Sequence, residues 1–97
     1  MFIGYDNFAT TTLTTSSNNV NRNSNVTFSA TVIDNDNNNP LEDLTVKFYD
    51  GNTLLGSGVT DSSGVATLTY TPTVAGSLTI KAYLGSLYSN SVTVVVV

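Results

Sequence analysis

Hydrophobic and polar side chains alternate along most of the chain, and the alternation is clearest in residues 26–32 (VTFSATV). Successive side chains of a β-strand point to opposite faces of the sheet, so this pattern predicts strands with one buried and one wet face. The central stretch, residues 45–70, repeats the pattern in three short runs. Two groups of turn-forming residues, 50–52 (DGN) and 61–64 (DSSG), separate these runs and predict reversals of the chain.

Over the whole chain, the same pattern predicts seven short strands and no helix. Polar loops rich in Asn, Ser, Gly and Asp separate the strands. Short alternating strands joined by regularly spaced turns are typical of two antiparallel sheets packed face to face. The predicted fold class is therefore all-β, an antiparallel β-sandwich of about seven strands, expected at residues 10–15, 25–33, 45–50, 53–57, 65–71, 77–84 and 90–97.

The predicted core consists of the apolar residues that share the inward phase of these strands. Leu13 is the inward residue of the first strand, which is otherwise rich in threonine. The other strands contribute Val26, Phe28, Ala30, Val32, Val46, Phe48, Ala66, Leu68, Tyr70, Leu78, Ile80, Ala82, Val92 and Val94.

A chain of 97 residues has the length of a single domain. Residues 2–4 (FIG) match residues 83–85 (YLG) as aromatic, aliphatic and glycine, and each group is followed by a second aromatic residue. We therefore expect residues 1–9 to be the tail of a preceding repeat or a linker, and residues 10–97 to form the domain. The first residues turn polar too early for a signal peptide, so we expect the chain to be a segment of a longer protein.

Composition and charge exclude several functions. The formal net charge is −4, and the only cationic side chains are Arg22, Lys47 and Lys81, which argues against binding to nucleic acid. No apolar run approaches the ~20 residues of a transmembrane helix, so this domain is not expected to insert into a membrane. The chain has no Cys and no His, and its acidic residues fall in predicted turns. We therefore expect no enzymatic activity, no catalytic residues and no cofactor.

Several segments, in their order along the chain, resemble the bacterial and archaeal immunoglobulin-like (Big) repeats of adhesin-like cell-surface proteins. They are residues 26–32, 46–51 (VKFYDG), 55–56 (LG), 61–66 (DSSGVA) and 83–85, and the resemblance covers residues 10–97. It implies an Ig-like sandwich at the cell surface, within a larger exported protein and beside neighbouring repeats of the same chain. It brings no catalytic residues with it.

The resemblance implies two kinds of function. The first is a structural spacer that extends a distal binding region from the cell. The alternative is an adhesive module that binds a host or environmental glycan or protein directly. An accessory domain of a surface polysaccharide-acting enzyme is a further form of this alternative, and the sequence does not separate the two.

One candidate ligand face lies on two predicted strands, 45–50 and 77–84. The alternation places Lys47 and Tyr49 on the outward side of the first strand, and Lys81 and Tyr83 on the outward side of the second. In an Ig-like sandwich these strands are antiparallel neighbours, so the four side chains should share one exposed surface. Aromatic rings stack on sugars and lysines pair with carboxylates. The alternative is ordinary cross-strand pairing on a wet face, which we favour.

The loop at residues 34–38 (DNDNN) fits the start of a calcium-binding loop, in which oxygen ligands alternate. The rest of that motif is missing, because Asn39 replaces the glycine of the turn and Thr45 replaces the closing glutamate. We therefore interpret the loop as an Asx-rich turn and predict no metal site.

Asn25 begins the only N-x-S/T sequence of the chain and is therefore a candidate glycosylation site. Val26 should point inward, so Asn25 and Thr27 should point outward, where a glycan can be attached.

An intramolecular isopeptide bond would need a buried lysine. Both lysines have outward phase, so we expect no such bond. Residues 92–97 (VTVVVV) would be prone to aggregate as an open edge, so we expect them to pair with residues 77–84.

Overall fold

The computed structural model describes residues 9–97, so the predicted tail at residues 1–9 lies outside the described residues except for Ala9. Nine strands make up the described chain. They are β1 (Ala9–Thr15), β2 (Asn19–Val20), β3 (Val26–Asp34), β4 (Thr45–Asp50), β5 (Thr53–Val59), β6 (Val65–Tyr70), β7 (Gly76–Leu84), β8 (Leu87–Tyr88) and β9 (Val92–Val96). Residues 9–97 contain no helix of the length and hydrophobicity needed to cross a membrane.

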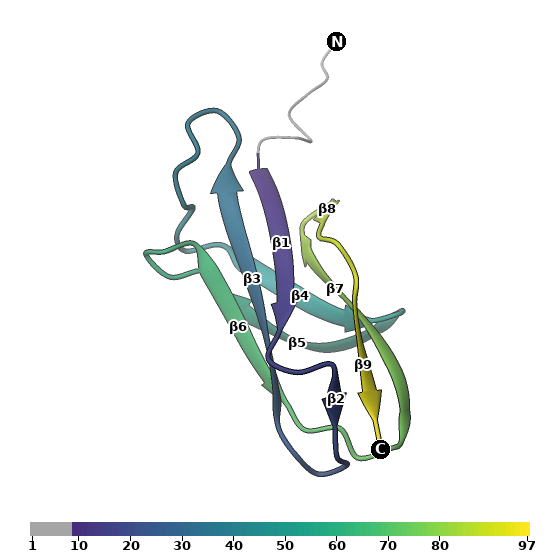
Figure 1. The fold of residues 1–97 in the computed structure, drawn as a ribbon. Coiled ribbons are helices and arrows are strands. Elements are labelled where there is room, and N and C mark those ends of the chain that lie inside the picture. The colour runs from purple at the N-terminus through teal and green to yellow at the C-terminus, as the bar shows by residue number, and fades with distance from the viewer. Residues whose placement is uncertain (1–8) are drawn as a thin grey trace.

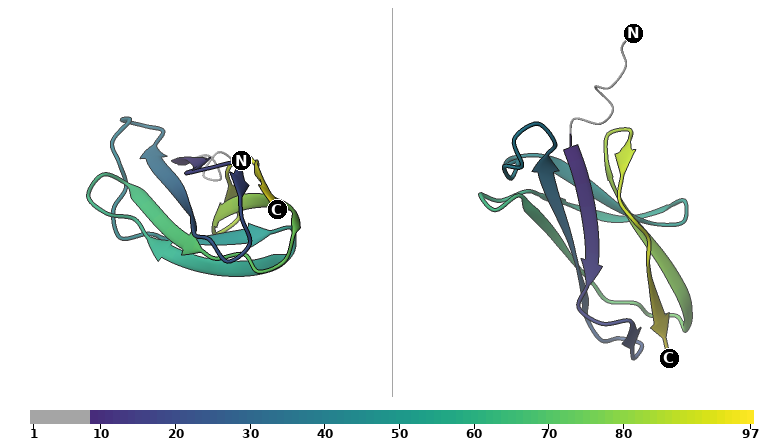
Figure 2. Two further views of the ribbon diagram at one scale, coloured as in Figure 1. Left: turned by 60° about the horizontal axis from the view of Figure 1, so that its bottom comes forward. Right: turned by 45° about the horizontal axis from the view of Figure 1, so that its top comes forward.

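The strands form two sheets that pack face to face (Figures 1 and 2). One sheet has the order β1-β3-β6, and the other has the order β2-β9-β7-β4-β5, with β8 paired to β7. Neighbouring strands are antiparallel except for β2 and β9, which are parallel. The prediction of an all-β, Ig-like sandwich is confirmed, and its seven predicted strands correspond to the seven longer ones. The two-residue strands β2 and β8 were expected to be loop and turn.

The core lies between the two sheets and is built from the inward side of each strand. Of the fourteen core residues predicted outside the first strand, ten are buried, and Leu68, Tyr70, Leu78 and Val92 are only half-buried. Leu68 and Tyr70 belong to β6, an edge strand, and Val92 begins β9. Edge strands and strand ends have fewer neighbours to cover them, which explains the partial exposure of these three residues. Leu13 is buried as expected, and Ala9, Val20 and Val96 complete the core.

The turn between β5 and β6 is one of the points at which the chain passes from one sheet to the other. The Asp61 carboxylate accepts hydrogen bonds from the backbone N–H groups of Ser63 (2.9 Å) and Val65 (3.0 Å). Gly64 closes the turn with a φ of 75°, and a Cβ at this position would lie 2.7 Å from the carbonyl oxygen of Val32. The turn therefore requires glycine for both its conformation and its close packing on β3.

The two ends of the described chain lie at opposite ends of the sandwich. β1 begins at one end, and the C-terminus lies at the other (Figure 1). The structure measures 46 × 28 × 17 Å along its principal axes. The valine-rich β9 is paired on both sides, to β7 and to β2. The expected pairing with residues 77–84 is thus confirmed, and β2 covers the other side of β9 at Val95 and Val96.

Candidate ligand-binding face

The antiparallel pairing of β4 and β7 brings the four predicted face residues together. Lys47 lies opposite Tyr83, and Tyr49 lies opposite Lys81. Lys47 is exposed and the other three side chains are half-buried, whereas the alternate residue Phe48 is fully buried. The pairing follows from the alternation of the two strands, since directly opposed residues of an antiparallel pair point to the same face.

Three tyrosines form a connected cluster on this face. The ring centroids of Tyr49 and Tyr83 are 5.3 Å apart with an interplanar angle of 81°, which is an edge-to-face arrangement. The ring of Tyr88 lies 5.8 Å from that of Tyr83. The ammonium nitrogen of Lys81 lies 4.6 Å from the centroid of the Tyr88 ring, within the range of a cation–π contact.

Tyr88 was not among the predicted face residues, because no strand was predicted between residues 84 and 90. In the structure, the chain reverses at Gly85 with a φ of 61° and returns along β7, so that Tyr88 lies opposite Tyr83. Tyr88 is 61% exposed. A glycine-containing two-residue loop between residues 83–84 (YL) and 87–88 (LY) is a hairpin signal, and it could have placed this tyrosine on the face.

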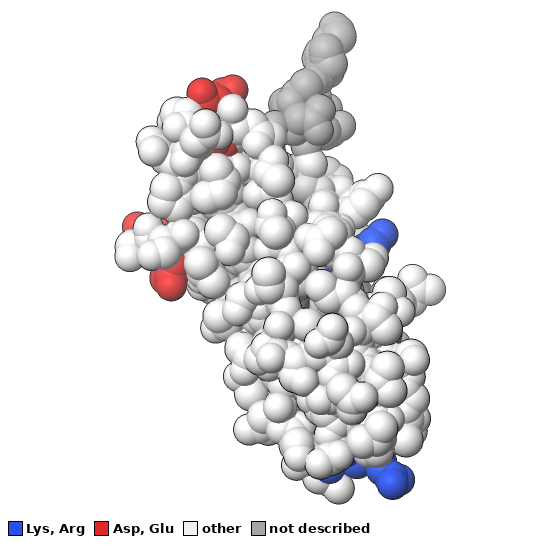
Figure 3. Space-filling model, in the orientation of Figure 1, with Lys and Arg blue, Asp and Glu red and all other residues white. Residues whose placement is uncertain are grey.

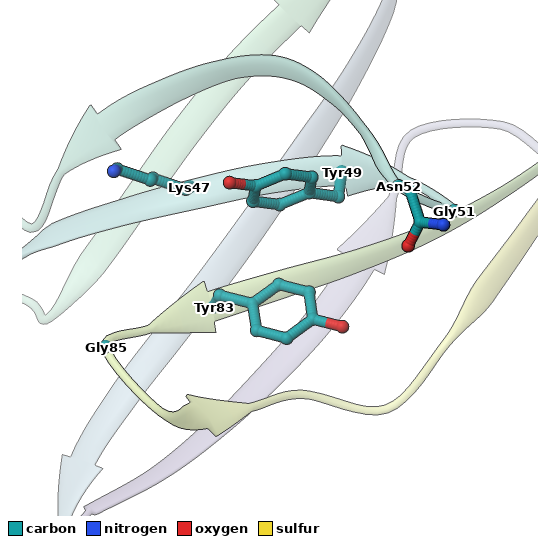
Figure 4. Close-up of a pocket in the computed structure, with 6 residues that line it drawn as sticks. All are labelled: Lys47, Tyr49, Gly51, Asn52, Tyr83 and Gly85. Carbon is teal, nitrogen blue, oxygen red and sulfur yellow. The ribbon is translucent and has the colours of Figure 1, made fainter.

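A shallow hollow with a volume of about 380 Å³ lies beside the tyrosines. Figure 4 shows Tyr49 and Tyr83 projecting from neighbouring strands, with Lys47 nearer the start of β4 and Asn52 in the turn that follows this strand. An irregularity in the β4–β5 pairing, between Phe48 and Tyr49, lies next to the hollow. Such bulges change the direction in which side chains point. The hollow is lined by Lys47, Tyr49, Gly51, Asn52, Tyr83 and Gly85.

The face has a distinct charge. It carries two of the three cationic side chains of a protein whose net charge is −4. In Figure 3, acidic side chains appear at the upper and left parts of the molecule and basic ones at its right and lower edges. Aromatic surface, an amide and two ammonium groups are the chemistry that recognises a sugar ring bearing a carboxylate.

Residues 10–97 match the model of the bacterial Ig-like domain (group 1) family. The chain belongs to this family. The match covers the whole sandwich except Ala9, and with it the strands that carry the tyrosine cluster. No curated protein sequence matches this bacterial Ig-like domain.

Several solved structures are similar to this bacterial Ig-like domain, and they include two intimin structures and a CARDB domain. The D00-D0 domain of intimin has a TM-score of 0.71 and 23% identity over 93% of this chain and 48% of that one. A C-terminal 282-residue fragment of intimin, in complex with the intimin-binding domain of the translocated intimin receptor, has a TM-score of 0.72 and 18% identity over 87% of this chain and 31% of that one. The chain thus spans less than half of either intimin chain.

The third structure is the CARDB domain of a Pyrococcus furiosus protein in complex with di-metal ions. Its TM-score is 0.69 and its identity 18%, over 92% of this chain and 87% of that one. At these identities the three structures support the fold of this Ig-like domain.

The loop at residues 34–39 of this Ig-like domain forms the expected Asx-rich turn. The Asp34 carboxylate accepts a hydrogen bond from the N–H of Asp36 (2.8 Å), and the Asn37 side chain accepts one from the N–H of Asn39 (3.0 Å). Within residues 9–97, no group of three His, Cys, Asp or Glu residues is placed to hold a metal ion. The prediction that the domain has no metal site remains a prediction.

Asn25, the candidate glycosylation site, is exposed immediately before β3. Its side-chain oxygen accepts a hydrogen bond from the Thr71 hydroxyl (2.5 Å). The hydroxyl of Thr27, which completes the sequon, lies 3.3 Å from that of Thr69. Glycosylation at Asn25 stays a prediction, and it would require this threonine pair to separate if the modifying enzyme needs the Thr27 hydroxyl.

Proposed function

We propose that this bacterial Ig-like domain is a spacer repeat of an adhesin-like cell-surface protein, and that it extends a distal binding region from the cell. The observation that carries this proposal is the position of the chain ends. β1 begins at one end of a sandwich that is 46 Å long, and the C-terminus leaves at the other (Figure 1). Consecutive copies joined in this way add length instead of folding back on one another.

The family and the surface of the domain support the same function. Bacterial Ig-like domains of this group and intimin domains are adhesin-type modules, typical of bacterial surface proteins. Much of the surface in Figure 3 carries neither acidic nor basic side chains. β2 covers the edge of β9 at Val95 and Val96. A short covering strand at a valine-rich edge hinders its pairing with neighbouring repeats.

The test is the shape of two copies joined in tandem. We expect small-angle X-ray scattering to show a maximum dimension that exceeds that of one copy by about the 46 Å length of the sandwich. The single domain, measured under the same conditions, is the control. A tandem protein whose maximum dimension is close to that of one copy would mean that the copies pack side by side, and it would contradict a spacer.

As a second candidate function, we propose an adhesive module that binds a carboxylate-bearing glycan through the tyrosine–lysine face. The face comprises Lys47, Tyr49, Lys81, Tyr83 and Tyr88, and the hollow beside it supports this proposal. The intimin fragment was solved in complex with a receptor domain, so a protein ligand is the competing choice.

A binding screen against acidic and neutral glycans tests this second function. We expect saturable binding to acidic glycans that is lost in the double variant Tyr49→Ala/Tyr83→Ala and weakened in Lys47→Ala. Arg22→Ala removes the third cation of the chain, which lies outside this face, and should bind like the wild type. Absence of binding at high micromolar concentration, or equal loss in Arg22→Ala, would exclude the glycan-binding face.

A further inference from the structure

The two terminal segments of the described chain are bonded directly to each other. The parallel strands β2 and β9 pair Asn19 with Val95 and Val20 with Val96. Three backbone hydrogen bonds of 2.9 Å join this region: Val95 N–H to Asn18 O, Val97 N–H to Val20 O, and Arg22 N–H to Val97 O. We propose that this contact is a mechanical clamp, which holds the domain folded under tension along the stalk. The spacer function supplies the tension; the clamp itself is a property of the domain.

The direction of the strands makes this contact resist tension. β1 leads from one end of the sandwich toward β2, and β9 runs parallel to β2 and finishes at the opposite end (Figure 1). Pulling on the two ends therefore draws β2 and β9 in opposite directions along their own axes. Hydrogen bonds between strands lie across those axes, so the three bonds are loaded together. They must break nearly at once, whereas bonds that are peeled from one end break one after another.

A second link joins the N-terminal and C-terminal segments of the described chain, at Leu13 in β1 and at Asn90, which lies before β9. We include this link in the clamp. The side-chain oxygen of Asn90 accepts a hydrogen bond from the N–H of Leu13 (2.8 Å), and its side-chain nitrogen donates one to the Leu13 carbonyl (3.1 Å). The amide of Asn90 thus takes the place of a neighbouring strand along the outer edge of β1. Because β1 belongs to the three-stranded sheet and Asn90 precedes β9, this link also connects the two sheets.

Asn90 is itself held in place through Ser89, which is 4% exposed. The Ser89 hydroxyl accepts a hydrogen bond from the N–H of Ala82 (2.9 Å) and donates one to the carbonyl of Asn90 (2.8 Å). The backbone N–H of Ser89 donates to the carbonyl of Ala82 (2.9 Å). Force on β1 is therefore transmitted from Leu13 to Asn90, and from Ser89 to Ala82 in β7, the central strand of the larger sheet. This path does not pass through β9.

The clamp should influence resistance to force more than equilibrium stability. β2 has only two residues, of which Val20 alone is buried, and Asn90 is exposed, so the hydrogen bonds of the clamp can be weakened at Asn90 without removing buried apolar surface. Both nevertheless lie on the direct path between the two pulled ends. A core residue such as Val46, which is fully buried in β4, has the opposite character, because it supports stability but lies outside that path.

The test is single-molecule unfolding of the 97-residue chain, held by its two ends between marker domains at constant force. We expect Asn90→Ala to raise the unfolding rate under force by about tenfold, since it removes two hydrogen bonds and each tenfold change corresponds to about 1.4 kcal/mol. Asn37→Ala is the matched control, because it removes a side-chain bond to the N–H of Asn39 in a loop outside the path. It should leave the rate unchanged. Equal rates for Asn90→Ala and the wild type would overturn the clamp.

Two further measurements separate a clamp from general stability. Val46→Ala should lower the equilibrium free energy of unfolding by an amount similar to that of Asn90→Ala, yet raise the unfolding rate under force less. A rate under force that rises as much in Val46→Ala as in Asn90→Ala would overturn the proposal. The chain has no cysteine, so a single Asn21→Cys substitution provides a unique handle beside β2. Pulling between this handle and the C-terminus should peel β2 from β9 and rupture that contact at a lower force than end-to-end pulling.

The handle experiment needs no change in the clamp itself, so it stands even if Asn90→Ala does not fold. Equal rupture forces in the two pulling directions would contradict loading in shear. All of these measurements use the isolated domain, so their failure would leave the spacer function standing. A compact tandem protein in the scattering experiment would contradict the spacer and leave the clamp intact.

Discussion

Two threonines of the sandwich bury their hydroxyl groups in very different surroundings. Thr60 is 2% exposed, and its side-chain oxygen accepts a hydrogen bond from the N–H of Leu44 (2.9 Å). Thr11 is 7% exposed, and among the described residues its side-chain oxygen has no hydrogen-bond partner. A buried polar group without a partner lowers the free energy of unfolding by ~1–3 kcal/mol, because its desolvation is not offset by a hydrogen bond. The two positions therefore respond in opposite ways to the loss of the hydroxyl.

We expect Thr11→Val to raise the free energy of unfolding by about 1 kcal/mol, because valine has nearly the same shape and no polar atom to satisfy. Thr60→Val, the same substitution, should lower it by ~1–3 kcal/mol, since the N–H of Leu44 would lose its acceptor. Denaturant unfolding of the two variants and the wild type measures both effects. If Thr11→Val is less stable than the wild type, its hydroxyl has a stabilising partner and the prediction is wrong.

For individual residues, strand periodicity alone could place four of the five members of the tyrosine–lysine face. Lys47, Tyr49, Lys81 and Tyr83 all have outward phase in strands whose alternation is clear. Tyr88 could not be placed in the same way, because its two-residue strand shows no period. Its position depends on the reversal at Gly85, and no hairpin was predicted at that glycine.

The turn between β5 and β6 connects the two sheets, and its geometry depends on Gly64. The backbone φ of 75° is one that residues with a Cβ rarely adopt. A Cβ would also meet the carbonyl oxygen of Val32 at 2.7 Å and the Cβ of Pro40 at 2.8 Å. Val32 additionally donates its N–H to the carbonyl of Gly64 (2.8 Å), so the turn cannot move away without losing this bond.

Gly64→Ala should therefore lower the free energy of unfolding by about 3 kcal/mol, as backbone strain and overpacking add. Gly51, in the turn between β4 and β5, is the control. Its φ is 57°, but a Cβ there would meet nothing within 4 Å. We expect Gly51→Ala to cost only the strain, about 1 kcal/mol. Thermal or denaturant unfolding compares the two, and similar losses would show that packing on β3 adds nothing.

The longer strands could be predicted from sequence, and the two shortest could not. Each of the seven longer strands has enough residues to show alternation, and their bounds agree with prediction to within two residues. β2 holds only Asn19 and Val20 within an Asn-rich loop, so no local pattern marks it. It forms because its partner β9 is present, which is a tertiary effect. The clamp was unpredictable for the same reason.

The topology of the whole molecule separates contacts that are near in sequence from contacts that join its ends. β4 and β5 form a hairpin across the short turn at Gly51 and Asn52. The β2–β9 contact, in contrast, connects Val20 with Val96 and requires nearly the entire chain to be in place. Closing a long loop costs more entropy than closing a short one. We therefore expect the hairpin to be present in the folding transition state and the terminal contact to form after it.

Val20→Ala and Val46→Ala test this order, because the two side chains are buried alike, at 8% and 0% exposure, and lose the same atoms. Each should cost ~1–2 kcal/mol, enough for a reliable comparison of rates. Val46→Ala should mainly slow folding, whereas Val20→Ala should mainly speed unfolding, as measured by stopped-flow kinetics in denaturant. The opposite assignment would mean that the chain ends meet early. Interactions that form after the transition state are those that slow unfolding. A terminal contact that forms late is therefore suited to keep a stalk repeat folded while it is under load.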